Sequence, residues 1–184
     1  MAYQPKNYRK FVATAATATL VASAIAPVAS AADFKDVSSK YKEAVDFVVS
    51  KGASGTTATT FGTDANIKRG DAAVLLVNVL GLDTATAPDA GFEDVNSRLA
   101  PYINALKAAG ITAGKTETTF DPDAQITRGE LAVWIYKGFG LEGESELEFK
   151  DVNKNYQAAV QALVANGVTT GTSSTTFGTT NNAK

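Results

Sequence analysis

Apolar residues recur at steps of three and four along several short stretches of this chain, a spacing typical of amphipathic helices. The stretches cover residues 41–52, 71–80, 100–110, 130–139 and 156–167. Each ends at a glycine or directly before one, and glycine is the residue that most often terminates a helix. Glycine- and threonine-rich loops lie between them. The pattern predicts a mainly α-helical fold.

Landmarks at a fixed spacing indicate that these helices belong to a repeat. The motif Phe-x-Asp-Val begins at Phe34, Phe92 and Phe149, at intervals of 58 and 57 residues. A second phenylalanine follows 27 or 28 residues after each of these, at Phe61, Phe120 and Phe177. Each unit is a predicted helix–loop–helix, which is too small to bury two amphipathic helices alone. We therefore expect the units to pack together, with these phenylalanines and Trp134 in the core.

The register of the repeat sets the domain boundaries. We expect the three units at 32–89, 90–147 and 148–184. Aligning the third unit with the first places Lys184 on Lys68, and no residue aligns with Arg69. The third repeat is therefore expected to be truncated, with its second helix missing.

The first 31 residues have the form of a secretory signal peptide. Lys6, Arg9 and Lys10 precede an apolar stretch at 11–28, and the small residues Ala29-Ser30-Ala31 form a cleavage site. Cleavage removes three of the 17 basic residues and none of the 19 acidic ones, which leaves a formal charge of −5. We therefore expect a secreted protein with no membrane partner after cleavage, and its acidic balance excludes nucleic acid as a partner.

The composition narrows the chemistry further. The chain contains neither histidine nor cysteine, so it lacks disulfides, the commonest zinc ligands and the commonest general base. Asp121 and Asp123 offer oxygen ligands for calcium, but they are far from a full ligand set. We expect no metal, no cofactor and no enzymatic activity.

One motif is unusual for a helix start. Thr127 is a good N-cap and Glu130 lies three residues later, so the two form a predicted capping box. Between them Arg128 occupies the first helical turn, where the helix dipole is positive and a cation is unfavourable. The first unit has the same feature at Lys68-Arg69-Gly70-Asp71. An arginine that is unfavourable for the empty helix becomes favourable once an anion binds, because free backbone N–H groups also converge there.

Taken together, Phe-x-Asp-Val, a helix, a Gly-x-x-x-Gly loop and Ile-Thr-Arg-(small)-Glu resemble the surface-layer homology (SLH) family. The resemblance extends over two full units and most of a third. It implies a mainly α fold of pseudo-threefold helical SLH repeats, and a location in the cell wall or S-layer of Gram-positive bacteria. It also implies non-covalent anchoring to a secondary cell-wall polysaccharide attached to peptidoglycan, which often carries pyruvate ketals. The arginine of the Thr-Arg-Ala-Glu motif is the family's characteristic ligand contact.

Carried over onto this chain, the family motif gives a set of expected ligand-binding residues. Arg128 and Arg69 are expected to contact the carboxylate of the polysaccharide, and Thr127, Glu130 and Asp71 belong to the same two motifs. Lys68 and Lys115 are expected to add long-range attraction. Gly114 is expected to let the sugar approach the backbone closely. These residues are Arg128, Arg69, Thr127, Glu130, Lys68, Asp71, Gly114 and Lys115.

Two other functions remain open at this point. A wall hydrolase needs little more than two carboxylates in a cleft, and Asp121, Asp123 and Glu130 are candidates. These acids recur with the repeat, however, as turn and capping residues do. A structural fragment that self-associates without binding the wall polymer is the second alternative, because an incomplete third unit exposes an apolar helix face.

Overall fold

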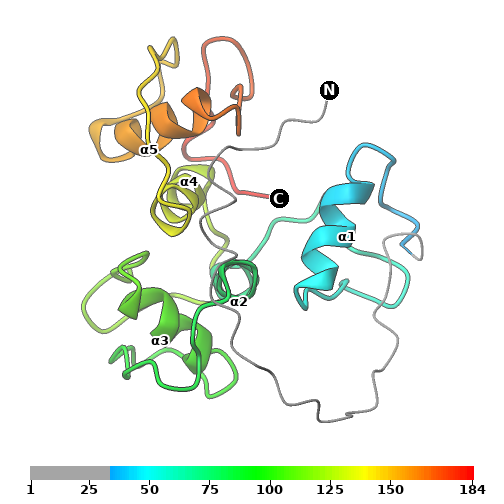
Figure 1. Ribbon diagram of the computed structural model, residues 1–184, viewed down its shortest axis with the longest axis vertical. Coiled ribbons are helices and arrows are strands. Elements are labelled where there is room, and N and C mark those ends of the chain that lie inside the picture. The colour runs from blue at the N-terminus through cyan, green and yellow to red at the C-terminus, as the bar shows by residue number, and fades with distance from the viewer. Residues whose placement is uncertain (1–33) are drawn as a thin grey trace, which may run out of the picture.

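The computed structural model describes residues 34–184 and contains five helices (Figure 1). The helices are α1 (Lys42–Ser50), α2 (Arg69–Leu80), α3 (Ala100–Ala108), α4 (Arg128–Gly138) and α5 (Lys154–Ala165). The described chain has isolated β-bridges but no strand. The predicted mainly α fold of SLH repeats is thus confirmed, with two helices in each of the first two repeats and one in the described part of the third. The predicted signal peptide lies outside the described residues.

Each repeat is closed by the aspartate of its Phe-x-Asp-Val motif. In the third repeat the carboxylate of Asp151 accepts hydrogen bonds from the backbone N–H groups of Phe177, Gly178 and Thr179, at 2.8, 2.7 and 2.9 Å. Asp36 and Asp94 accept equivalent bonds in the first and second repeats. The motif therefore fastens the start of each repeat to the loop that follows its first helix, about 26 residues later.

The paired phenylalanines of each repeat lie against one another beside this clasp. Their ring centroids are 5.4, 5.7 and 6.0 Å apart in the three repeats, within the range of favourable aromatic pairs. Four of the six rings are buried and two, Phe61 and Phe149, are half-buried against the same clusters. Trp134 is also buried. The prediction that these residues form the core is confirmed.

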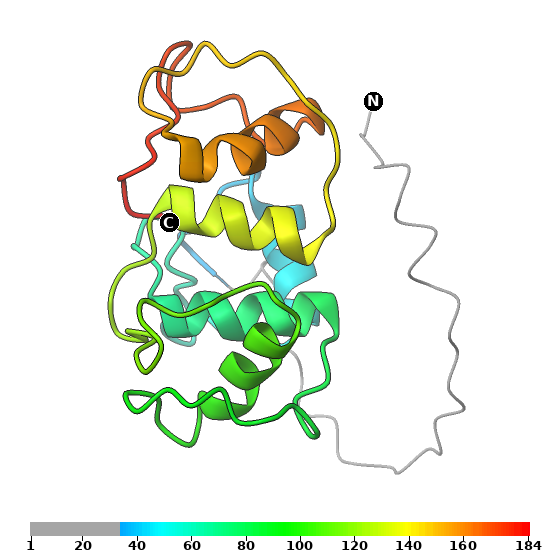
Figure 2. The same ribbon diagram turned by 90° about the vertical axis from the view of Figure 1, so that its left-hand side faces the viewer.

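The repeats pack in a regular order. The second helix of one repeat lies on the first helix of the next, α2 on α3 and α4 on α5, and α2 also contacts α4. Figure 2 shows this stack, with α4 between α2 and α5. The largest apolar cluster joins α2, α3 and Trp134 of α4, whereas α1 belongs to a separate small cluster around Phe34, Val45 and Val49.

Three backbone hydrogen bonds join the repeats in a closed ring. The N–H of Ile67 donates to the carbonyl of Ala183 at 3.0 Å, that of Ala183 to Ile126 at 2.8 Å, and that of Ile126 to Ile67 at 3.1 Å. These residues occupy the same position in the three repeats. The ring therefore marks the pseudo-threefold axis, and the third repeat completes it through Ala183.

The Asp151 clasp generates a prediction about stability and pH. Burial raises the pKa of Asp151, but the hydrogen bonds from Thr179, Phe177 and Gly178 more than offset this, so its pKa lies below the usual 3.8. The bonds from Gly62 and Phe61 likewise lower the pKa of Asp36. A carboxylate with a depressed folded-state pKa stabilises the fold above its unfolded pKa, and this contribution is lost as pH falls through the folded pKa.

We therefore expect the free energy of unfolding, measured with urea, to fall as the pH is lowered from about 5 to about 2. Asp151→Ala should cost about 1–3 kcal/mol at pH 7, because partly buried N–H donors lose their acceptor. The variant should also flatten the pH dependence. Asp64→Asn is the control, since Asp64 is exposed and accepts no hydrogen bond in the described structure. An unchanged pH profile in Asp151→Ala would contradict the assignment.

Candidate functional site

The two arginines singled out by the sequence stand at the first residues of α2 and α4. The predicted capping box is present at α4: Thr127 Oγ1 accepts from the N–H of Glu130 at 3.3 Å, and Glu130 Oε2 accepts from the N–H of Thr127 at 3.0 Å. At α2 the N-cap is Lys68, which makes no side-chain cap. The helix starts are thus equivalent in position but not in capping.

The first-turn N–H groups are not free to bind an anion, so this part of the prediction is wrong. The N–H groups of Arg69 and Gly70 donate to the carbonyls of Ala124 and Pro122, at 2.8 and 2.9 Å. At α4 the N–H groups of Arg128 and Gly129 donate to Asn181 and Thr179, at 2.8 and 3.0 Å. The loop of the following repeat therefore takes the donors that a bound anion would need. Recognition of an anion is left to the side chains.

The same close approach accounts for the glycine beside each arginine. A Cβ atom at Gly70 would lie 2.8 Å from Leu99 Cδ1, and one at Gly129 would lie 2.8 Å from Thr179 Cγ2. Both contacts are with the following repeat. The glycines therefore serve the packing between repeats at helix starts, where their low helix propensity matters little.

Both arginines reach across to the following repeat in the same geometry. The Nε–H of Arg69 donates to the carbonyl of Phe120, and that of Arg128 to the carbonyl of Phe177, each at 3.0 Å. Each guanidinium carbon lies 4.9 Å from the ring centroid of that same phenylalanine, a cation–π contact. The Nε–H and one face of each guanidinium are thus engaged before any ligand arrives, and the Nη atoms remain for an acceptor.

At the junction of the first two repeats, that acceptor is Glu130. Arg69 Nη1 lies 3.2 Å from Glu130 Oε1, and the guanidinium also packs over Trp134 with its carbon 5.2 Å from the ring centroid. Arg69 is only 2% exposed. Burial lowers its pKa, and the carboxylates of Glu130, Asp121 and Asp94 oppose this shift. Arg69 is therefore a buried inter-repeat contact rather than an open cation.

Glu130 is the centre of this junction. Its carboxylate accepts hydrogen bonds from Lys115 Nζ and from both the N–H and the hydroxyl of Thr127, in addition to the pair with Arg69. Burial raises the pKa of Glu130, but these donors and cations more than offset it and hold the pKa below its usual value. The junction therefore holds one carboxylate between two cations. Lys115, whose side chain is 41% exposed, faces solvent.

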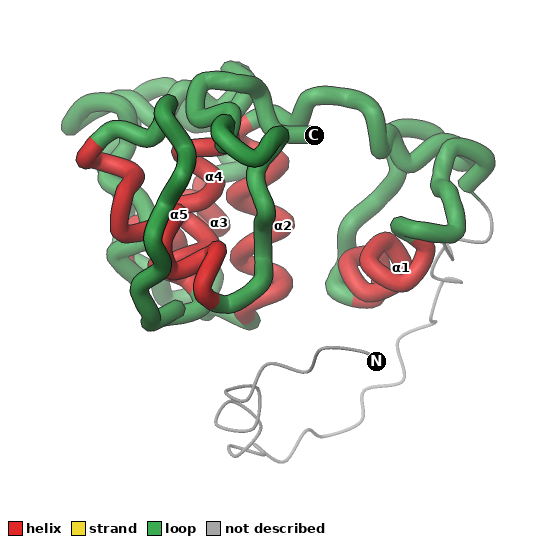
Figure 3. Tube along the Cα trace, turned by 90° about the horizontal axis from the view of Figure 1, so that it is seen from above, coloured by secondary structure: helices red, strands yellow, loops and turns green. Residues whose placement is uncertain are grey.

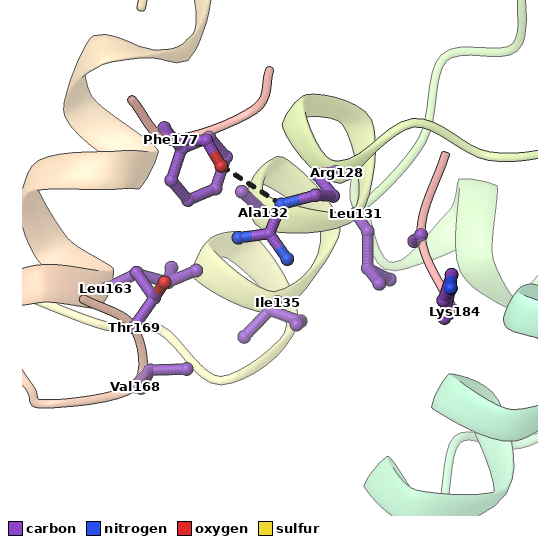
Figure 4. Close-up of a pocket in the computed structure, with 10 residues that line it drawn as sticks. Arg128, Leu131, Ala132, Ile135, Leu163, Val168, Thr169, Phe177 and Lys184 are labelled. Carbon is purple, nitrogen blue, oxygen red and sulfur yellow. Dashed lines mark hydrogen bonds between the residues drawn. The ribbon is translucent and has the colours of Figure 1, made fainter. Parts of the chain in front are cut away.

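The junction of the second and third repeats has the arginine but no such carboxylate. Arg128 is half-buried, and no described acid lies within ion-pair distance of it. Its guanidinium lines a pocket of about 170 Å³, together with Lys184, Thr169 and a majority of apolar residues (Figure 4). The walls include Leu131, Ile135, Leu163, Val168 and Phe177. This pocket is a positively charged site with hydrophobic sides.

The remaining predicted residues lie outside these two clusters. Lys68 Nζ forms an exposed ion pair with Asp123 Oδ1 at 2.8 Å, which raises the pKa of Lys68 through the hydrogen bond and charge of Asp123. Asp71 is exposed and forms no ion pair in the described chain. A Cβ atom at Gly114 would overlap the ring of Phe92, so packing inside the repeat accounts for that glycine.

The structure thus joins Arg69, Thr127, Glu130 and Lys115 in one network and leaves Arg128 in a second, open one. Sequence reasoning missed that Phe120, Phe177 and Trp134 support the guanidiniums, although the recurrence of the phenylalanines was a usable signal. Among residues 34–184 no group of acids is arranged to hold a metal ion. Nor is any helix in this range long and apolar enough to cross a membrane.

The contrast between the two arginines predicts unequal effects on stability. Arg69→Gln leaves Glu130 partly buried with one cation fewer and should cost about 3 kcal/mol. Arg128→Gln removes a hydrogen bond and a ring contact but strands no described carboxylate, and should cost about 1 kcal/mol. Urea unfolding at pH 7 measures both variants. Equal losses would show that the Arg69–Glu130 pair adds nothing to the contacts that the two arginines share.

Comparison with known proteins gives a consistent assignment. The family model of the S-layer homology domain matches residues 33–73, 91–132 and 148–184. The chain is 42% identical over 185 residues to the surface-layer 125 kDa protein of Lysinibacillus sphaericus, which covers 93% of this chain and 15% of that protein. It is 29% identical to S-layer protein EA1 of Bacillus anthracis, over 90% of this chain and 20% of that protein.

An uncharacterized cell wall amidase of Bacillus anthracis is also similar, at 30% identity over 89% of this chain and 32% of that protein. The chain thus spans less than a third of the length of each of these relatives. SLH domains are non-catalytic modules that anchor S-layer and other cell-surface proteins to the cell wall. The repeat register, the helical fold and the family match lead to one conclusion: this chain belongs to the S-layer homology domain family, whose members are secreted cell-wall and S-layer proteins.

Proposed function

We propose that this chain holds a protein at the cell surface by binding acidic groups of a secondary cell-wall polysaccharide at its two arginine junctions. Family membership supports the anchoring role. The arginine geometry supports the choice of an acidic ligand. The alternative is a self-associating fragment without affinity for the polymer. It is favoured by exposed apolar side chains among the described residues, namely Tyr41 before α1, Phe47 on α1, Phe139 and Val168.

The observation that carries this proposal is the match between Arg69 and Arg128. Both guanidiniums are fixed by the same carbonyl and ring contacts, and at Arg69 the Nη edge already binds a carboxylate. Arg128 presents the same edge with no described carboxylate beside it. The Arg69–Glu130 pair is therefore an internal example of the ligand chemistry that Arg128 is oriented to accept.

Charge at both junctions favours the same ligand. The first junction places two cations, Arg69 and Lys115, on the one carboxylate of Glu130. The second junction contains Arg128, and no described acid lies within ion-pair distance of its guanidinium. The first junction thus carries about one excess positive charge, and the pocket at the second is lined by two basic side chains, Arg128 and Lys184, although the chain as a whole is acidic. An anionic polymer is attracted locally while the rest of the surface discourages non-specific contact.

The pocket at Arg128 also indicates the size and chemistry of the ligand group that carries the acidic charge. At about 170 Å³ it is smaller than the pockets of about 300–1,000 Å³ that hold drug-sized ligands. It fits a substituent of a sugar rather than a stretch of polysaccharide. A pyruvate ketal combines a carboxylate for the guanidinium with a methyl group for the apolar walls. Such a charge-assisted contact is among the stronger hydrogen-bonded interactions in proteins.

Co-sedimentation with purified Gram-positive cell walls tests the proposal. The chain should bind walls that retain the secondary polymer and lose most binding after acid extraction of that polymer. Arg128→Gln should weaken binding about tenfold or more, because a hydrogen-bonded charge pair contributes about 1.5–3 kcal/mol. Lys115→Gln should have a smaller effect, since Lys115 is exposed and screened.

Lys35→Gln is the matched control, because it removes one exposed positive charge outside both junctions. Equal binding of Arg128→Gln and Lys35→Gln would contradict the proposed role of the arginine. Equal binding to intact and extracted walls would contradict the polymer as the ligand. Sedimentation of the chain at rising concentration without walls would instead favour self-association.

A further inference from the structure

We infer that Asn166 is a site of spontaneous deamidation, and that its intact amide latches the acidic linker at residues 142–148 to the end of α5. Asn166 is followed by Gly167, whereas every other asparagine of the chain precedes a larger residue. Asparagine is chemically labile, and most so before glycine, which has no side chain to hinder the reaction. The latch acts within the third repeat and is independent of polysaccharide binding.

The fold fixes a glycine after the first helix of each repeat. These glycines have positive φ angles of 91°, 71° and 69°, at Gly52, Gly110 and Gly167 respectively. A residue with a side chain is strained in this conformation, so the position favours glycine. The residue before the glycine is Lys51 in the first repeat, Ala109 in the second and Asn166 in the third. The labile pair therefore arises in one repeat, and the other two provide inert equivalents.

The side chain of Asn166 ties the linker to α5. Its Nδ2 donates to the carbonyl of Ala162, one turn back on α5, at 2.8 Å and to the carbonyl of Glu142 at 2.7 Å. In Figures 2 and 3 the linker leaves the end of α4 and passes the end of α5 as a loop. Within residues 34–184 the bond to Glu142 is the one side-chain hydrogen bond that joins this linker to another element. The amide of Asn166 is therefore a latch between two elements.

The second repeat holds its linker by different residues. Asn104 Oδ1 accepts from the N–H of Ala90 at 3.0 Å, and Lys107 Nζ donates to the carbonyl of Ala90 at 2.7 Å. The equivalent residues of the third repeat are Gln161 and Val164, and neither side chain forms a hydrogen bond in the described structure. The third repeat thus depends on Asn166 for its polar contact with the linker.

Deamidation begins when the backbone nitrogen of Gly167 attacks Cγ of Asn166. The new N–Cγ bond forms as the Cγ–Nδ2 bond breaks, and the Nδ2 amino group leaves as ammonia with the proton of the Gly167 N–H. Water then opens the five-membered imide at one of its two carbonyls, which yields aspartate or isoaspartate. The sum is one asparagine and one water converted into one acid and one ammonia, so no oxidant or reductant is needed.

The folded helix end blocks this reaction. The ψ of Asn166 is 5°, which places the nitrogen of Gly167 beside the nitrogen of Asn166, whereas ring closure needs it on the Cβ side. Turning ψ breaks the bond from the Gly167 N–H to the carbonyl of Val164, which is 2.9 Å long. The Nδ2 must also leave both of its acceptors. The reaction therefore requires local opening of this end of α5.

Deamidation replaces the latch by repulsion. A carboxylate at position 166 has no N–H to donate, and its oxygens face the carbonyls that the amide had bound. The linker already carries four exposed carboxylates, at Glu142, Glu144, Glu146 and Glu148. Refolding does not reverse the reaction, so a transient opening of α5 becomes a permanent release of the linker.

Peptide mapping by mass spectrometry tests the protection. The full chain is incubated in mildly alkaline buffer, folded and in guanidinium chloride, and conversion of each asparagine is followed with time. In denaturant Asn166 should react faster than Asn78, which precedes Val79. In the folded chain Asn166 should react about tenfold or more slowly than in denaturant, because only the locally open population reacts. Equal rates in the folded and denatured chains would overturn the inference.

The variant Asn166→Asp reproduces one product and tests the latch. It should raise hydrogen exchange of the amides in 142–148 several-fold and expose the linker to a glutamate-specific protease. Asn166→Ala copies the second repeat and removes the bond without adding charge, so its effect should be smaller. Asn96→Asp is the control for a new charge, because Asp can accept the same two backbone bonds as Asn96. It should leave the linker unchanged.

Helix content by circular dichroism verifies that each variant is folded. Exchange in 142–148 that is the same in Asn166→Asp as in the native chain would overturn the latch. A rise of the same size in Asn96→Asp would overturn it as well, since the effect would then not depend on the contact between Asn166 and Glu142.

Discussion

The ring of backbone hydrogen bonds between Ile67, Ile126 and Ala183 determines where every other part of this fold can lie. Each ring residue stands two positions before a helix start or its equivalent, so the ring fixes the origins of α2 and α4 on a common axis. The next N–H groups along the chain then donate to the loop of the following repeat. N–H groups at a helix N-terminus have no acceptor within the helix, and here they find acceptors in another repeat.

This arrangement also explains why an arginine is tolerated where the helix dipole disfavours a cation. The side chain does not remain over its own helix end. It crosses to the next repeat, where a carbonyl accepts from Nε and an aromatic ring packs on the guanidinium. Lysine has no planar group to make both contacts at once. The unfavourable interaction of a cation with the helix dipole, a few tenths of a kcal/mol, is small compared with these two contacts.

The local parts of this structure were predictable from the sequence, whereas the contacts between repeats were not. Helical periodicity and the capping box at Thr127 depend on residues a few positions apart, and both are confirmed. The pair of Arg69 with Glu130 joins residues 61 positions apart, and no local pattern encodes which repeat supplies the acid. The prediction of free N–H groups at the helix starts is wrong for the same reason, because carbonyls in the loops of another repeat accept hydrogen bonds from them. The contact between Gly114 and the ring of Phe92 joins residues 22 positions apart, and no local pattern encodes it either.

A repeated site has consequences that a single site does not. Under the proposed function, a polysaccharide with several acidic groups meets two junctions, which the backbone ring holds on one frame. Once one junction holds the polymer, the second sees the next acidic group at a high effective concentration, so two weak contacts combine into much tighter attachment. Loss of Arg128 then removes both its own contact and the gain from simultaneous binding. Under the proposed function, this coupling is the physical reason for building an anchor from repeats, since each carboxylate contact alone is modest and easily reversed.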